Sequence, residues 1–204
     1  MRPHGFVQAG GGSTRFGSDK ALAELAGKSM LQRTSELLAG VCHDVTIVAP
    51  EGKYPKAMSP VLADRWPGQG PLGGILTALA MMQNPDCTAG WALIVSCDMP
   101  FLTQEFLGFL WERAAESKAQ VVVPQSATGL EPLCACWRAG TAGGVQAAFD
   151  SGVRKVTEAM KCLPMEVLDE AAWKRFDTKG RLFWNMNTPE DFAEARHILE
   201  TQDQ

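Results

Sequence analysis

The chain has 204 residues, of which 46% are hydrophobic, and its formal net charge is -4. This length suits one domain over residues 1–204 with a substantial core. No apolar run approaches the roughly 18 residues of a membrane helix, and the negative charge argues against a general nucleic-acid binder. The first four residues lead closely into a glycine-rich loop without a signal peptide's apolar segment, so a cytoplasmic location is expected.

The first predicted strand, at Phe6 and Val7, is followed by a glycine-rich segment with basic residues. Gly10 to Gly12 are consecutive, and Arg15 and Lys20 follow them. Glycine adopts positive φ cheaply, so the N–H groups of such a run can converge on phosphate oxygens. The guanidinium group of Arg15 can form two parallel hydrogen bonds to a phosphate, and the ammonium group of Lys20 adds a compact positive charge. The segment therefore predicts a polyphosphate site.

Two familiar phosphate motifs do not fit this segment. A P-loop requires lysine after the second glycine of Gly-x4-Gly, but Gly17 is followed by Ser18. A dinucleotide fingerprint starting at Gly10 would need glycine where Arg15 stands. A nicotinamide cofactor is not expected.

The next stretch alternates helical and strand-like patterns. Ser29 can cap a helix whose apolar residues recur at helical spacing, and Val45–Ala49 reads as a strand. Asp64 follows an apolar triplet at a strand-to-loop transition, where an acid is commonly a local hydrogen-bond acceptor. The small residues of Gly70–Gly74 let backbone approach a ligand closely, and a helix is predicted from Pro71 to Met82.

Asp98 follows the end of the predicted buried strand Trp91–Ser96, and Pro100 favours an extended backbone after it. A carboxylate at such a strand end can hold Mg²⁺, which prefers oxygen ligands and often shares them with substrate phosphates. Alternatively, Asp98 caps the next helix, but Thr103 fits that cap better. Asp98 is therefore a candidate ligand for Mg²⁺.

The rest of the chain continues the alternation. Thr188 is predicted to cap the final helix, with Pro189 at its first position. The other expected elements are a helix from Thr103 to about Ser117, strands at Val121–Pro124 and Leu133–Trp137, and one or two helices within Gly143–Cys162. The alternation implies an α/β layered sheet with its site at the carboxyl ends of strands.

The six cysteines include no Cys-x-x-Cys pair, so reduced thiols are expected rather than a zinc site or a disulfide framework. Cys134 and Cys136 are predicted to lie on one side of a strand. The three histidines stand in unrelated contexts and give no triad or metal spacing.

Five blocks in order along the chain resemble the MobA-like nucleotidyltransferases, best known as molybdenum cofactor guanylyltransferases. Gln8 and Phe16 depart from the leucine and methionine usual in that family. The resemblance implies a three-layer αβα Rossmann-like nucleotidyltransferase fold with a mostly parallel sheet. The blocks are Ala9–Leu22 with Gly27-Lys28, Asp64–Gly74, Ser96–Leu102, Glu131–Leu133 and Asn185–Asp191.

The same resemblance implies roles for the first blocks. Arg15, Lys20 and Asp98 would be catalytic, with Mg²⁺ on Asp98. The family often has an asparagine after the second strand that helps to read guanine, whereas here Ala49 is followed by Pro50, which leaves guanine against cytosine open. The expected nucleotide-binding residues are Ala9, Gly10, Gly11, Gly12, Ser13, Lys20, Asp64, Gly70, Pro71 and Asp98.

For the second substrate, the resemblance implies contacts from Arg154, Asn185 and Asn187. An extended backbone would point both asparagine amides the same way. The alternatives are turn chemistry for the asparagines and a solvated helix start for Arg154. Glu131 would line the acceptor pocket without acting as a base, because a phosphate nucleophile is already ionised near neutral pH.

The reaction that these expectations describe is in-line attack by the terminal phosphate of molybdopterin on the α-phosphate of GTP. Pyrophosphate leaves, and a guanine dinucleotide cofactor forms. One alternative keeps the chemistry with CTP, a sugar phosphate or another phosphorylated cofactor. Another is a regulatory protein that binds nucleotide without turnover, which the presence of Arg15, Lys20 and Asp98 disfavours. A reactive cofactor also suggests transient contacts with cofactor biosynthesis or recipient enzymes, and the oligomeric state stays open.

Overall fold

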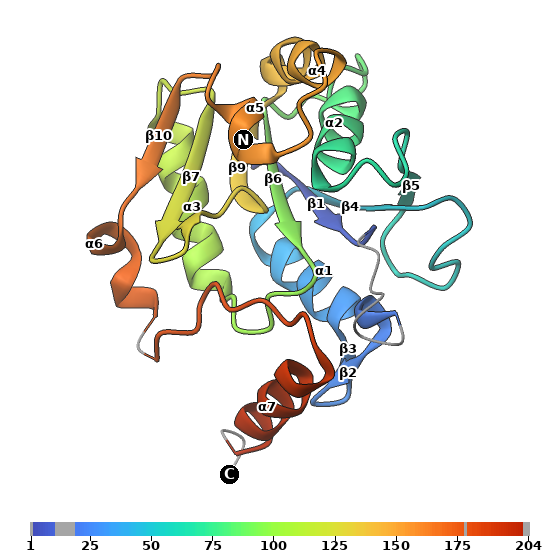
Figure 1. The fold of residues 1–204 in the computed structure, drawn as a ribbon, viewed down its shortest axis with the longest axis vertical. Helices are drawn as coiled ribbons and strands as arrows, with labels where there is room; N and C mark the ends of the chain where they lie inside the picture. Colours follow the sequence, from blue (N-terminus) through green and yellow to red (C-terminus); the bar gives the residue numbers. More distant parts are fainter. Residues whose placement is uncertain (1, 11–18, 178, 202–204) are drawn as a thin grey trace.

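The computed structural model describes residues 2–10, 19–177 and 179–201 (Figure 1). Within these residues an eight-stranded sheet has the order β10-β7-β9-β6-β1-β4-β5, with β8 paired to β7. A separate hairpin joins β2 (Glu24–Leu25) and β3 (Lys28–Ser29). The strands of the large sheet are β1 (His4–Gln8), β4 (Asp44–Ala49), β5 (Val61–Ala63), β6 (Trp91–Ser96), β7 (Val121–Ser126), β8 (Gly129–Leu130), β9 (Cys134–Arg138) and β10 (Met165–Leu168).

The sheet is mostly parallel, as predicted. β1 pairs in parallel with β4 on one side and β6 on the other, and β5 and β10 extend the sheet in parallel with β4 and β7. β9 runs antiparallel to both of its neighbours, β6 and β7. Because β1, β4 and β6 share one direction, their last residues, Gln8, Ala49 and Ser96, lie at the same edge of the sheet.

Helices cover both faces of the sheet, which confirms the three-layer αβα architecture (Figure 1). One core joins the sheet to α1 and α3, and the other joins it to α2, α4 and α5. The helices are α1 (Met30–Val41), α2 (Pro71–Met81), α3 (Gln104–Glu116), α4 (Ala142–Asp150), α5 (Val156–Met160), α6 (Glu170–Trp173) and α7 (Pro189–Glu200), with 3-10 turns at Lys20–Leu22, Ala139–Thr141 and Lys174–Phe176.

Neighbouring residues of a central strand belong to opposite cores. In β6, Leu93 faces one core and Ile94 the other, and both are fully buried. In β9, Cys134 and Cys136 share one core, as predicted, and both thiols are free. Burial on both faces explains why these strands are apolar along their length rather than alternately polar.

The predicted helix starts are confirmed by side-chain hydrogen bonds. Ser29, Thr103 and Thr188 each accept a bond from a backbone N–H in the first turn of α1, α3 and α7. Thr188 and Asp191 complete a reciprocal capping box. Helix α2 ends at Met81, one residue before the predicted end, and the region 143–162 contains parts of two helices, α4 and α5.

Several small elements were not predicted: β8, β10, α6, the β2–β3 hairpin and the 3-10 turns. β10 has the sequence Met-Glu-Val-Leu, and only Leu168 in it is buried, so it lacks the apolar run of the central strands. It exists because its backbone pairs in parallel with β7 at the sheet edge. Such pairing with a distant segment leaves no local sequence signal.

The segment before α7 is held against the rest of the molecule by a small apolar cluster. Met186 and Ala195 pack with Leu25 of the hairpin and Met30 of α1. Phe101 and Trp184 stack beside this cluster with ring centroids 5.5 Å apart. This packing fixes the position of the neighbouring residues Asn185 and Asn187.

No helix in the described part of the chain has both the length and the apolar character needed to cross a membrane. The prediction that residues 1–204 form a single domain stays a prediction.

We expect Thr188→Ala to lower the free energy of unfolding by about 1 kcal/mol, because the Asp191 N–H loses the hydroxyl oxygen that accepts its hydrogen bond in the capping box. Urea denaturation measures this loss. The matched control is Thr201→Ala, at the other end of α7. Its hydroxyl donates to the carbonyl oxygens of His197 and Ile198 in the last turn of the helix. Equal losses in the two variants would contradict a specific contribution from the cap.

Candidate active site

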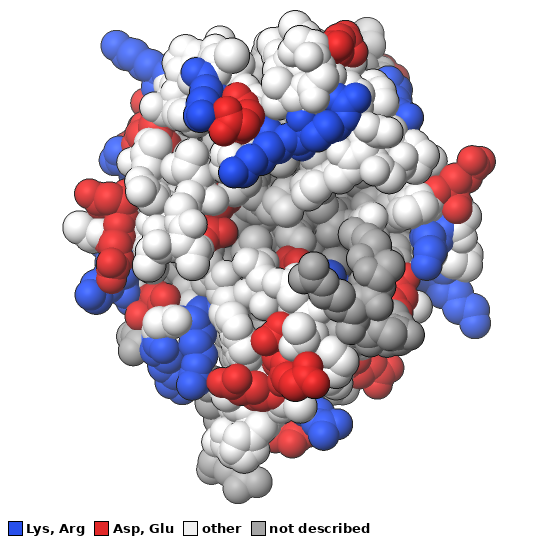
Figure 2. Space-filling model, in the orientation of Figure 1, with Lys and Arg blue, Asp and Glu red and all other residues white. Residues whose placement is uncertain are grey.

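A cavity of about 390 Å³ opens at the carboxyl edge of β1, β4 and β6. Figure 2 shows this face hollowed near its centre, with basic side chains along the upper rim. The cavity gathers residues predicted to bind nucleotide, namely Ala9, Gly10, Lys20, Asp64, Gly70, Pro71 and Asp98. The predicted residues Gly11, Gly12, Ser13 and Arg15 lie outside the described residues.

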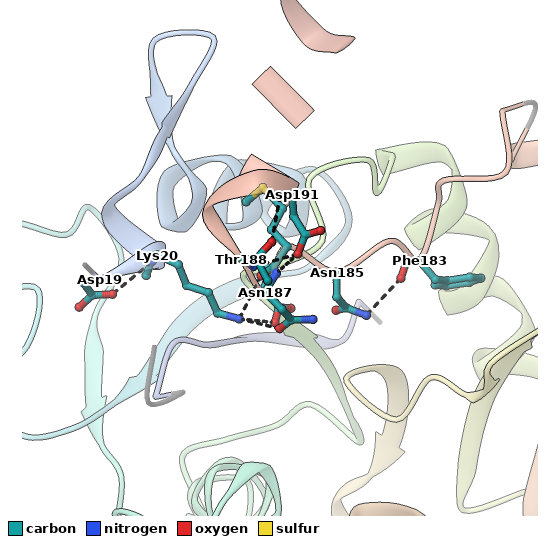
Figure 3. Close-up of polar contacts among 10 residues, drawn as sticks. Asp19, Lys20, Phe183, Asn185, Asn187, Thr188 and Asp191 are labelled. Carbon is teal, nitrogen blue, oxygen red and sulfur yellow. Dashed lines mark hydrogen bonds and ion pairs between the residues drawn. The ribbon is translucent and has the colours of Figure 1, made fainter. Parts of the chain in front are cut away.

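Lys20 and Asp98 form an ion pair at this edge. Lys20 Nζ lies 2.8 Å from Asp98 Oδ2, and the two side chains are only 16% and 15% exposed. Lys20 also lies 3.3 Å from the Met186 carbonyl oxygen and 3.5 Å from Asn187 Oδ1 (Figure 3). One ammonium group therefore connects the end of the glycine-rich segment, the end of β6 and the segment before α7.

The surroundings of Asp98 suit a divalent cation that also binds phosphate. Thr103, and not Asp98, caps α3, as predicted. Asp98 Oδ1 is buried and has no hydrogen-bond partner among the described residues. Nor do the described residues contain a group of three His, Cys, Asp or Glu side chains placed to hold a metal. A cation here would thus take one carboxylate from the protein and further oxygens from substrate, as Mg²⁺ commonly does.

Asp64 is fixed by the first turns of α2. Its Oδ1 accepts bonds of 2.9 Å from the Trp66 N–H and from the hydroxyl of Thr77, which is fully buried. The same Thr77 oxygen accepts the Arg65 N–H at 3.0 Å. Asp64 Oδ2 takes part in none of these bonds. The sequence expectation of a local hydrogen-bond acceptor is thus met by one oxygen, while the side chain still lines the cavity.

The start of α2 brings backbone close to the cavity, as predicted. Gly70 has φ +75°, a value that side-chain-bearing residues rarely adopt, and Pro71 begins the helix. A Cβ on Gly74 would lie 2.9 Å from Oε1 of Gln8, so the first turn of α2 and the end of the Gln8 side chain approach each other closely. Gln8, which departs from the family's leucine, therefore places a carboxamide in the cavity lining.

Asn185 and Asn187 lie beside the ion pair, but their amides have different partners. Asn187 faces Lys20, whereas Asn185 Nδ2 donates to the Phe183 carbonyl at 3.2 Å (Figure 3). The Met186 N–H between them donates to the Asp98 carbonyl at 2.9 Å. Asn185 lines a second cavity, of about 690 Å³, together with Ser126, Thr128, Trp173, Lys174 and Trp184.

The structure does not bring Arg154 together with the two asparagines. Its guanidinium stacks on Phe149 at 3.9 Å and donates to Gln69 Oε1 at 2.8 Å. Gln69 stands between Gly68 and Gly70, so Arg154 braces the loop that leads into α2 on the nucleotide side. Its predicted role with the second substrate stays a prediction.

Glu131 lies at the start of the turn into β9, near the second cavity. It is 8% exposed, and its Oε1 accepts a 2.6 Å bond from Ser126. Burial raises the pKa of this carboxyl above its ordinary value, the Ser126 and Thr128 hydroxyls oppose that shift, and the charge of Asp98 adds to it. Glu131 is thus a buried hydrogen-bonding group close to the carboxyl edge of the sheet.

Two further residues at the site received no role from the sequence. Asp19 lines the first cavity, and the hydroxyl of Tyr54 contacts its carboxylate. Asp19 had a usable signal, since it directly precedes Lys20 in the glycine-rich block. Tyr54 had none, because it stands in a loop after β4 far from every motif.

The cavity lies at the carboxyl edge of a sheet that helices cover on both faces, and a lysine–aspartate pair lines it. This arrangement is typical of α/β nucleotide-binding proteins. Residues 5–163 match the model of one family, described as the MobA-like NTP transferase domain. The chain therefore belongs to the MobA-like NTP transferase family, and it is a nucleotidyltransferase by class.

Its relatives match almost the whole chain. A protein of Chloroflexus aggregans named probable molybdenum cofactor guanylyltransferase is 30% identical and covers 98% of this chain and 97% of its own length. The molybdenum cofactor guanylyltransferase of Desulfosudis oleivorans is 31% identical and covers 96% of this chain and 95% of its own.

Solved structures share the fold. The molybdopterin-guanine dinucleotide biosynthesis protein A of Archaeoglobus fulgidus superposes with a TM-score of 0.83 at 24% identity, covering 97% of this chain and 99% of that one. The 2-C-methyl-D-erythritol 4-phosphate cytidylyltransferase of Thermus thermophilus reaches 0.71 at 14% identity, covering 98% and 100%. At these identities the likeness concerns the fold alone.

We expect Thr77→Val to lower the free energy of unfolding by about 1–3 kcal/mol, because the Arg65 N–H and Asp64 Oδ1 lose a buried partner. Urea denaturation measures the loss. Thr34→Val is the matched control: Thr34 is also buried in a helix, but its hydroxyl donates only to the carbonyl four residues earlier. A Thr77 variant no less stable than the Thr34 variant would rule out this support for Asp64.

Proposed function

We propose that this chain transfers GMP from GTP to the terminal phosphate of molybdopterin and releases pyrophosphate, which makes the guanine dinucleotide form of the cofactor. The observation that carries the proposal is the mostly buried Lys20–Asp98 pair in the lining of the first cavity, in a family whose relatives carry the name molybdenum cofactor guanylyltransferase. GTP and molybdopterin are the two substrates.

The two cavities suit the two substrates. The glycine-rich side, Lys20 and the start of α2 line the smaller cavity, which offers backbone N–H groups and a cation to a triphosphate. Aromatic side chains and Asn185 line the larger cavity, which offers a flat ring system both stacking and hydrogen-bonding partners; Lys174 in the same lining is paired with Glu170 at 3.1 Å. In-line displacement requires nucleophile and leaving group on opposite sides of the α-phosphorus. Lys20 and Asp98 line the smaller cavity, and the segment before α7 connects it with the larger one, because Asn187 lies 3.5 Å from Lys20 and Asn185 lines the larger cavity.

The chain's own residues align the two substrates and neutralise the negative charge of their phosphates. An oxygen of the acceptor phosphate forms a bond to the α-phosphorus, while the bond from that phosphorus to the bridging oxygen of pyrophosphate breaks. Lys20 offsets negative charge at this point, and Asp64 and the α2 start hold the nucleoside. The nucleophile is an ionised phosphate oxygen, so neither Glu131 nor any histidine has to remove a proton.

Mg²⁺ fits the residues present, with Asp98 as its protein ligand. Asp98 Oδ1 is a buried oxygen without a hydrogen-bond partner among the described residues. When bound, the ion would supply Lewis-acid stabilisation of the phosphate charges. Lys20, now paired with Asp98 Oδ2, would then also face the phosphates.

The choice of base has a specific rival. Pro50 follows β4 where the family often has an asparagine, and it lies near the glycine-rich segment, since a Cβ on Gly10 would be 3.8 Å from Pro50 Cδ. Transfer of CMP from CTP is therefore the second candidate. A cytoplasmic location and transient contacts with cofactor biosynthesis or recipient enzymes stay predictions.

Asp98→Asn is expected to slow pyrophosphate release roughly a hundredfold or more, because an amide keeps the shape but removes the charge that holds the cation. Lys20→Met is expected to lose activity in a similar way. Circular dichroism checks that both variants fold. The control is Lys161→Met, which removes an exposed ion pair with Glu158 far from the cavities. Activity within a few-fold of wild type in either site variant would refute that residue's role.

Pyrophosphate release should occur with GTP only when molybdopterin and Mg²⁺ are both present. EDTA should abolish it, and added Mg²⁺ should restore it. Assays with GTP, CTP, ATP and UTP distinguish the candidates. Preference for CTP would assign cytidylyl transfer, and release with none of the four would contradict molybdopterin as the acceptor.

A further inference from the structure

The two described ends of the glycine-rich segment meet at one side chain. Ala9 precedes the segment and Asp19 follows it. The Tyr54 hydroxyl lies 3.1 Å from the Ala9 carbonyl oxygen and 3.0 Å from each oxygen of the Asp19 carboxylate. The hydroxyl has one proton, which these acceptors share, so one group in a third segment of the chain, the loop after β4, contacts both ends.

The charges at this contact favour a strong bond. Burial raises the pKa of the Asp19 carboxyl, but hydrogen bonds from Lys53, Tyr54 and the Ala21 N–H outweigh it and leave the pKa below its ordinary value. Burial and the negative charge of Asp19 raise the pKa of the Tyr54 phenol. The phenol thus keeps its proton at neutral pH and can donate it to a carboxylate, and such charge-assisted bonds are shorter and stronger than neutral ones.

The backbone of Tyr54 supports a constrained role. Its φ is +54°, and Ala26 is the one other non-glycine residue with positive φ in the described chain. A bulky residue in this region is strained, and it persists where the surroundings hold it. The Tyr54 ring is buried, 7% exposed, in the core that also contains Ala9 and Ala21.

Asp19 connects the Tyr54 contact with the Lys20–Asp98 ion pair. Its carboxylate caps the short 3-10 turn Lys20–Leu22 by accepting the Ala21 N–H at 3.2 Å. That turn begins with Lys20, whose ammonium pairs with Asp98. Any shift of Asp19 therefore moves the base of the lysine side chain.

We propose that Ala9, Tyr54 and Asp19 form a clasp that fixes both ends of the glycine-rich segment and orients Lys20 toward the nucleotide phosphates. Tyr54 is then a positioning residue, because it acts through Asp19 and Lys20. The inference rests on the proposed function only in that the cavity binds a nucleoside triphosphate, of whatever base.

Tyr54→Phe keeps the ring and removes the one hydroxyl. We expect its dissociation constant for GTP or CTP with Mg²⁺, measured by calorimetry without acceptor, to rise roughly tenfold, the effect of about 1.4 kcal/mol. The control is Thr46→Val, which removes a buried hydroxyl bonded to His4, away from the cavity. It should lose similar stability and keep its affinity. Unchanged affinity in Tyr54→Phe, or equal loss in the control, would overturn the clasp.

A spectroscopic test does not depend on affinity. Tyr54 is the only tyrosine of the chain, so 3-fluorotyrosine labelling gives a single fluorine signal whose titration reports this phenol. In Asp19→Asn the midpoint should move to lower pH, because the neighbouring negative charge is gone; an unchanged midpoint would show that the phenol does not face the carboxylate. Wild-type protein that binds nucleotide but transfers nothing would refute the proposed function and leave both tests of the clasp intact.

Discussion

The ion pair between Lys20 and Asp98 is the interaction on which the site depends. Lys20 follows the glycine-rich segment, Asp98 lies two residues after the end of the central strand β6, and the segment before α7 contacts both through Met186 and Asn187. Both charged side chains are mostly buried, so each needs the other. Parallel strands β1 and β6 make the meeting possible, because they deliver both chain segments to one edge.

Such an arrangement suits a reaction between two anionic substrates. The pair lines a cavity with phosphate-binding features, and the segment before α7 that contacts Lys20 also contributes Asn185 to a second cavity with aromatic groups. In the proposed reaction the site contributes charge and alignment rather than proton transfer, so no histidine or other base is needed at the carboxyl edge of the sheet. The same logic explains why Glu131 can stay buried among hydroxyls and serve as a hydrogen-bonding group.

The sequence predicted much of the fold because its signals were local. Ser29, Thr103 and Thr188 were recognisable caps, and long apolar runs marked the central strands. β10 escaped prediction because pairing with β7, and not its own composition, makes it a strand. At the site, Asp64 and Asp98 were found from their positions after strands, whereas Tyr54 was missed because its partners Ala9 and Asp19 are distant in sequence.

The sequence by itself determined the order of elements, the layered α/β class and the residues that carry charge and flexible backbone, since these follow from short-range pattern and residue chemistry. The tertiary structure alone decided which of them meet. It joined Lys20 to Asp98 and Asn187, turned Asn185 toward Phe183, and set Arg154 on Phe149 and Gln69, away from the asparagines. The reason is that the order of the parallel strands and the packing of the helices decide which residues come into contact. Neither can be predicted from the spacing of residues along the chain.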